Sequence, residues 1–192
     1  MKLIPTLLIA PLFLGMVWQF VPKRSILNLT RREVHFPTVS GFNLNRQEFQ
    51  FPRDLAGELN ILFVPFKQHQ QSTVNTWVPF AQETEARFPG VVYYELPTID
   101  EMPALSRMFV NEGMRAGIPD ETARERTVTL YIDTGKFMEA TAIPDKNAVH
   151  ILLVNREGDI LWRTTGDFDQ QKGRSLVEAI QVNRQGAVQP VD

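Results

Sequence analysis

The 192-residue chain contains no cysteine. This absence excludes disulfide bonds, cysteine-ligated zinc sites and every reaction that needs a thiolate nucleophile. It indicates no particular compartment, because a chain without cysteine suits oxidising and reducing surroundings alike. An excess of one charge is also lacking, since 20 basic and 22 acidic side chains give a formal net charge of −2. Without a basic run, the sequence indicates no nucleic-acid partner.

Short motifs of catalysis and cofactor binding are absent as well. The sequence has no G-x-S-x-G nucleophile motif, no H-E-x-x-H metal motif, no phosphate-binding Walker loop and no dinucleotide fingerprint. We therefore expect no catalytic residues and no cofactor.

A long apolar run is present at the N-terminus, over residues 3–21, broken only by Thr6 and Gln19. About twenty apolar residues are enough to cross a bilayer as a helix. Residues 1–22 are therefore predicted to be a membrane anchor or a cleaved secretory signal. The length of the run and the absence of an A-x-A pattern favour the anchor, with the membrane as partner through residues 3–21.

The charges around this run bear on localisation. Four basic residues follow the run and only one precedes it: Lys23, Arg24, Arg31 and Arg32, against Lys2. The positive-inside rule then favours a membrane-associated protein whose domain faces the cytoplasm or a matrix-like compartment. A cleaved signal would instead place the domain in the periplasm, and both alternatives remain open.

Beyond the apolar run, residues 23–40 are expected to form a linker, 41–183 one domain, and 184–192 a tail. Alternating polar and apolar residues over 42–51 predict a hairpin. The continuous apolar run 60–66 is typical of a strand that is covered on both faces.

Helical spacing follows in two places. Val74, Trp77 and Ala81 predict a helix capped by Ser72 or Thr73. Leu105, Met108 and Phe109 predict one apolar face of a second helix, capped by Asp100. Further strands are predicted over 91–96, 127–133, 148–155 and 159–163, and further helices over 136–142 and 169–182. The expected fold is α/β, with a mixed sheet flanked by helices.

This order of elements, with the closing segment 154–166, resembles the thioredoxin and peroxiredoxin superfamily. Four segments (72–80, 114–119, 126–131 and 159–163) are more specifically similar to the mitochondrial ATPase complex assembly factor family, subunit ten, and its bacterial relatives. The resemblance covers residues 41–182. It implies a thioredoxin-like, membrane-associated protein that chaperones the proton-channel subunit of ATP synthase.

The chain departs from redox thioredoxins at both halves of their active site. The C-x-x-C pair is expected at Gln70 to Thr73 and the cis-proline near Val149, and neither is present. We therefore predict a non-redox binding protein, not a dithiol or peroxidatic enzyme, whose partner is another protein such as a membrane-complex subunit. The candidate partner-binding residues are Gln70, Thr73, Trp77, Arg115, Arg126 and Trp162.

Each of these residues has a simpler interpretation. Core packing explains the spacing of Trp77 and Trp162 equally well, and interleaved acids suit a solvated mixed surface around Arg115 and Arg126. A second functional hypothesis is a copper or zinc carrier, since His69 and His150 flank the two vacant redox positions. Two imidazoles alone leave a metal ion short of ligands.

Overall fold

The computed structural model describes residues 34–186. The predicted anchor and the first part of the predicted linker lie outside the described residues, as does the end of the tail. Among residues 34–186, no helix combines the length and the apolarity that are needed to cross a bilayer.

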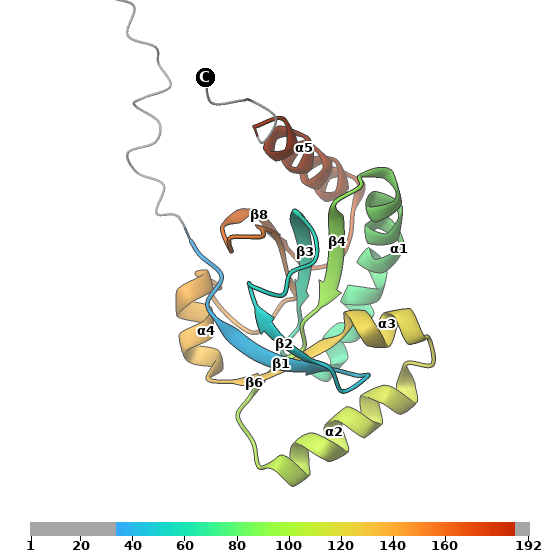
Figure 1. Ribbon diagram of the computed structural model, residues 1–192, viewed down its shortest axis with the longest axis vertical. Helices are drawn as coiled ribbons and strands as arrows, with labels where there is room; N and C mark the ends of the chain where they lie inside the picture. The colour runs from blue at the N-terminus through green and yellow to red at the C-terminus, as the bar shows by residue number, and fades with distance from the viewer. Residues whose placement is uncertain (1–33, 187–192) are drawn as a thin grey trace, which may run out of the picture. The chain divides into compact units, whose positions relative to one another are not determined.

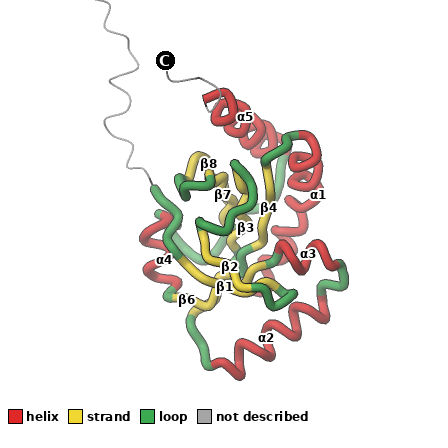
Figure 2. The backbone as a smooth tube through the Cα atoms, viewed as in Figure 1, coloured by secondary structure: helices red, strands yellow, loops and turns green. Residues whose placement is uncertain are grey.

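Strands occupy the centre of the described domain and helices surround them (Figures 1 and 2). The strands are β1 (Val39–Asn43), β2 (Glu48–Phe51), β3 (Leu59–Val64), β4 (Val91–Glu95), β5 (Thr98–Asp100), β6 (Val128–Ile132), β7 (His150–Asn155) and β8 (Ile160–Thr165). The helices are α1 (Gln71–Arg87), α2 (Ala104–Gly117), α3 (Glu121–Arg126), α4 (Thr134–Thr141) and α5 (Gln170–Gly186), and a 3-10 turn, η2 (Gln68–Gln70), directly precedes α1.

The strands form two mixed four-stranded sheets, in the orders β2-β1-β6-β5 and β4-β3-β7-β8. The predicted hairpin is confirmed as the antiparallel pair β1 and β2. The sequence predicted one sheet, but the extended stretch that holds β4 and β5 is interrupted at Pro97. Proline has no N–H to continue a ladder. The stretch therefore pairs with β3 before this residue and with β6 after it.

β3 is buried along its whole length because both of its faces are covered. Leu59, Ile61 and Phe63 point to the face that α1 and α5 cover, while Leu62 and Val64 point to the opposite face. Alternate residues of a strand face opposite sides, so a strand between two apolar layers has no exposed position. The apolar run 60–66 is thus correctly interpreted as a two-sided strand.

Several predicted boundaries are wrong for local reasons. Asp100 does not cap a helix, since it lies in β5 and accepts hydrogen bonds from the Thr134 hydroxyl and from Lys146 Nζ. α1 begins at Gln71, and the Ser72 hydroxyl donates to the His69 carbonyl instead of capping. Phe36, within the predicted linker, has no exposed surface and packs in the core. β5 and α3 were not predicted, because both are too short to show a periodic pattern of apolar residues.

α2 differs from the other long helices because none of its residues is buried. It runs along the edge of the domain, beyond β1 and β6 in Figure 1. Polar contacts hold it: Arg115 Nε donates to the Leu44 carbonyl at 2.7 Å, and the Tyr131 hydroxyl donates to Asn111 Oδ1 at 2.8 Å. Its apolar side chains are therefore left for something other than the domain core.

Candidate functional site

Gln70 occupies the place where a redox member of this fold is expected to carry a cysteine. Its side chain is 4% exposed. Its Oε1 atom accepts hydrogen bonds from the backbone N–H groups of Phe66 at 2.7 Å and Lys67 at 3.1 Å. Its Nε2 atom donates to the Lys146 carbonyl at 2.8 Å. A buried amide thus ties the end of β3 to the segment before β7, and the two vacant redox positions share one corner of the fold.

Thr73 is the other end of the vacant cysteine pair. Its hydroxyl donates to Asp167 Oδ1 at 2.5 Å and so links α1 to the turn before α5. Two residues after Asp167, Asp169 accepts from the Lys172 N–H, as a helix cap does. Neither Gln70 nor Thr73 offers an unoccupied side chain at the surface.

The two histidines do not form a metal site with other ligands. His69 is exposed, and His150 is buried with its Nε2 donating to the Asp145 carbonyl at 2.9 Å. Burial lowers the pKa of His150, which keeps this imidazole neutral near pH 7. No group of three or more histidine, aspartate or glutamate side chains within residues 34–186 is arranged to hold a metal ion.

Both tryptophans of the predicted partner surface pack inside the domain. Trp77 has no exposed surface, and its Nε1 donates to the Gly166 carbonyl at 2.9 Å. Trp162 is partly buried against the α1 and α5 layer, with its Nε1 donating to the Ser175 hydroxyl at 3.0 Å. The structure thus places Trp77 in the core, as the simpler interpretation of its spacing describes.

The two arginines join elements of the fold. Arg126 donates to Glu85 Oε1 at 2.7 Å and lies 5.5 Å from the ring centre of Tyr93, which connects the end of α3 to α1 and β4. Arg115 donates to the Leu44 carbonyl and to Glu112 Oε1, at 2.7 and 2.8 Å. Their guanidinium groups are engaged within the domain.

A groove of about 820 Å³ opens beside Gln70, between α2 on one side and the end of β3 with the start of α1 on the other. We call it the α2 groove. Its lining residues are Pro65, Phe66, Lys67, Gln68, Gln71, Asn75, Pro97, Ile99, Met102, Phe109, Val110, Gly113, Met114, Gly117, Ile118 and Thr127. The groove therefore extends from the exposed face of α2 to the corner at Gln70, where a redox member of this fold is expected to carry its cysteines.

The two walls of the α2 groove differ in polarity. The α2 wall is apolar or bare, because Phe109, Val110 and Met114 alternate with glycines along one helical face. The opposite wall presents the side-chain amides of Gln68, Gln71 and Asn75, with Lys67 as the one formally charged lining residue. Such a surface suits an apolar ligand with a polar or anionic group on one side.

A buried carboxyl group lies directly behind the polar wall. Gln71 Nε2 donates to Glu95 Oε2 at 3.1 Å and also to Asn75 Oδ1 at 3.1 Å. Glu95 is 7% exposed, and burial raises its pKa above the usual range for a glutamate. The polar wall is thus fixed from behind by a side chain that does not itself line the groove.

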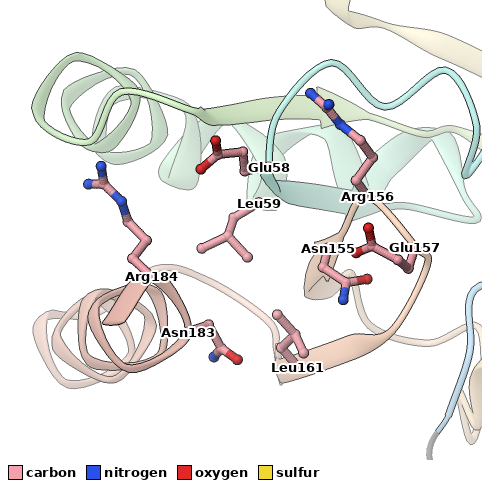
Figure 3. A pocket seen from close by; sticks show the side chains of 8 residues that line it. All are labelled: Glu58, Leu59, Asn155, Arg156, Glu157, Leu161, Asn183 and Arg184. Carbon is pink, nitrogen blue, oxygen red and sulfur yellow. The ribbon is translucent and has the colours of Figure 1, made fainter. Parts of the chain in front are cut away.

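A second hollow, of about 480 Å³, lies at the opposite end of β3 (Figure 3). Acidic and basic side chains alternate around it, with Glu58 and Glu157 beside Arg156 and Arg184. Arg156 Nη2 donates to the Ala56 carbonyl at 3.0 Å, and Arg184 lies over the Phe88 ring. Because opposite charges are interspersed, this hollow shows no chemistry that a particular ligand would match.

One feature of the sequence points to the α2 groove. The sequence predicts an apolar helical face with Leu105, Met108 and Phe109, and in the structure Phe109 of this face is 67% exposed and lines the groove. Which surface this face borders depends on the break at Pro97 and on the polar contacts of Arg115. Neither is visible from residue spacing.

Comparison with known proteins supplies the fold. No protein-family model matches the sequence, and no curated protein matches it. Among solved structures, a thiol:disulfide interchange protein from a Bacteroides species has a TM-score of 0.51 at 18% identity, and the match covers 78% of this chain and 87% of that one. A protein from Aquifex aeolicus VF5 assigned to electron transport has a TM-score of 0.56 at 13% identity, over 80% and 98% of the two chains.

BsSco, a member of the Sco family of cytochrome c oxidase assembly proteins, has a TM-score of 0.52 at 10% identity, over 78% of this chain and 94% of that one. At such identities the likeness concerns architecture alone. Together with the strand order and the vacant corner at Gln70, it shows that the described domain has a thioredoxin-like fold without the cysteines of its redox members.

Proposed function

We propose that this chain is a non-redox, thioredoxin-like binding protein that holds an apolar segment of another protein in the α2 groove. The role that fits best is assembly factor or chaperone for a membrane protein complex such as ATP synthase. The observation that carries the proposal is the α2 groove itself, because an amphipathic helix leaves its apolar face outside the core and beside the vacated redox corner. Exposed apolar surface of this kind marks interaction sites in soluble domains.

Two further observations support an assembly role. The segments 72–80 and 114–119, for which we propose a resemblance to the ATPase assembly factor family, both contribute residues to the groove: Asn75 from the first, and Met114, Gly117 and Ile118 from the second. BsSco also has this fold and is described as an assembly protein with a disulfide switch. Because the present chain has no cysteine, the proposed role uses binding and no thiol chemistry.

Site-specific photo-crosslinking in native membranes tests the proposal. A photoreactive amino acid replaces Phe109 on α2 in one variant and Val182 on α5 in the other. Both side chains are 67% exposed, so the pair is matched for accessibility. We expect the variant at position 109 to crosslink to a subunit of a membrane complex, identified by mass spectrometry, and the variant at position 182 not to do so. Identical products from both positions, or none from position 109, would contradict the proposal.

A further inference from the structure

We infer that the occupant of the α2 groove is a single apolar α-helix of the partner protein, which carries one acidic side chain that pairs with Lys67. This inference rests on the proposed function and specifies its ligand. Three features of the groove support it: its charge, the shape of its α2 wall and the hydrogen bonds that its backbone already makes.

The charge of the groove indicates which sign of charge its occupant carries. Lys67 carries the one formal charge among the lining residues, and no acidic side chain lines the groove. Lys67 Nζ donates to Asn147 Oδ1 at 3.1 Å, but it has no carboxylate within ion-pair distance among residues 34–186. An acidic group on an apolar occupant meets an uncompensated cation there, whereas a basic group meets repulsion.

The backbone of the groove favours a helix over an extended peptide. An extended peptide binds by adding a strand to a sheet edge with free N–H groups. Pro65 and Pro97 have no N–H, and the N–H groups of Leu96 and Thr98 already donate to the carbonyls of Phe63 and Pro65. A helix satisfies its own backbone groups and needs only side-chain contact.

The α2 wall has room for such a helix. A Cβ atom added at Gly113 or Gly117 would meet nothing within 4 Å. These glycines lie one helical turn apart, between the apolar side chains of Phe109, Met114 and Ile118. A bare strip with apolar side chains around it permits close approach of a second helix. From Phe109 to Ile118 the wall is roughly 14 Å long, at about 1.5 Å per residue.

Synthetic helices test the inference with the full-length chain in detergent. Three labelled 20-residue leucine–alanine peptides with neutral ends carry a central glutamate, glutamine or lysine, and fluorescence anisotropy gives their dissociation constants. We expect the glutamate peptide to bind about fivefold more tightly than the glutamine peptide, as one partly exposed ion pair allows. The lysine peptide binds most weakly. Lys67→Gln removes the preference for glutamate.

A substitution that fills the groove distinguishes a loss of peptide binding from a loss of the folded structure. Gly113→Leu raises the helix propensity of α2, so it does not unfold the helix. It is expected to weaken all three peptides at least tenfold. The matched control is Ala116→Leu, which adds the same side chain to an exposed position of α2 outside the groove. This control is expected to leave the dissociation constants unchanged.

Equal affinity for the three peptides, absence of binding by all of them, or full binding by Gly113→Leu would overturn the inference. These outcomes are distinct from failure of the proposed function. If position 109 crosslinks to a membrane-complex subunit but the three peptides bind equally, the acidic helix is excluded as the ligand. The groove then remains the proposed binding site. Absence of both results removes the function as well.

Discussion

At the residue scale, Gln70 forms structural hydrogen bonds at a position where redox members of this fold are expected to use a reactive cysteine. Its amide accepts from the Phe66 and Lys67 N–H groups and donates to the Lys146 carbonyl, in a place from which water is largely excluded. Buried polar groups that lose their partners destabilise the fold by about 1–3 kcal/mol. The corner is therefore held together by an amide at a position where a redox member of this fold is expected to carry a cysteine.

Replacing Gln70 measures this contribution. We expect Gln70→Ala to lower the free energy of unfolding by about 2–3 kcal/mol, because three backbone groups lose their partner together. The neighbouring Gln68 is exposed, so Gln68→Ala is expected to change stability by less than about 0.5 kcal/mol. Urea unfolding of both variants checks the prediction, which fails if the two are equally stable.

Glu95 makes stability depend on pH. Its pKa is raised in the folded state by burial, so the folded protein retains this proton to a higher pH than the unfolded chain does. The stability that Glu95 contributes is thus fully present below the unfolded-state pKa and is lost as pH rises through the folded-state pKa. Glu95→Gln keeps an acceptor for Gln71 but has no proton to lose.

We therefore expect the stability of Glu95→Gln, relative to the parent, to increase from pH 4 toward pH 8. The slope between the two pKa values is at most about 1.4 kcal/mol per pH unit. Carboxyl groups with lowered pKa values, such as Asp100, affect both proteins equally and cancel in the difference. Urea unfolding across this pH range gives the comparison, and a constant difference would show that Glu95 ionises normally.

At the element scale, α2 and α1 use aromatic side chains in opposite ways. Trp77 of α1 is fully buried, whereas Phe109 of α2 is 67% exposed. We expect Trp77→Ala to cost about 3–5 kcal/mol of stability. Phe109→Ser is expected to cost less than about 0.5 kcal/mol, because it removes no core contact. Thermal or urea unfolding separates the two, and a large loss from Phe109→Ser would mean that α2 packs as a core helix.

The elements that the sequence predicted correctly are those whose spacing of apolar residues results from burial in the core. The run that became β3 and the spacing of Val74, Trp77 and Ala81 in α1 are confirmed, because a core imposes its own periodicity. In α2 the same helical spacing of apolar residues is present, but none of the residues of this helix is buried. β5 and α3 were missed since three and six residues are too few to show a period.

For the whole molecule, topology was easier to predict than the site. Alternating strands and helices with a closing hairpin indicated a thioredoxin-like fold, and the meeting of Gln70 with Lys146 places both vacant redox positions at one corner. The α2 groove depends on two features of tertiary structure. Pro97 divides β4 from β5, and polar contacts such as that of Arg115 hold α2 at the edge of the domain. Neither feature follows from local pattern.

The central claim is that a partner covers the α2 groove in native membranes, and single-cysteine labelling tests it most directly. The chain has no cysteine, so Phe109→Cys and Val182→Cys each introduce a unique thiol. Maleimide labelling rates are measured in opened native membranes and with the purified full-length protein. If a partner covers the groove, labelling at position 109 is several-fold slower in membranes than in the purified protein, and the rates at position 182 are equal. Equal rates at position 109 in both preparations would contradict it.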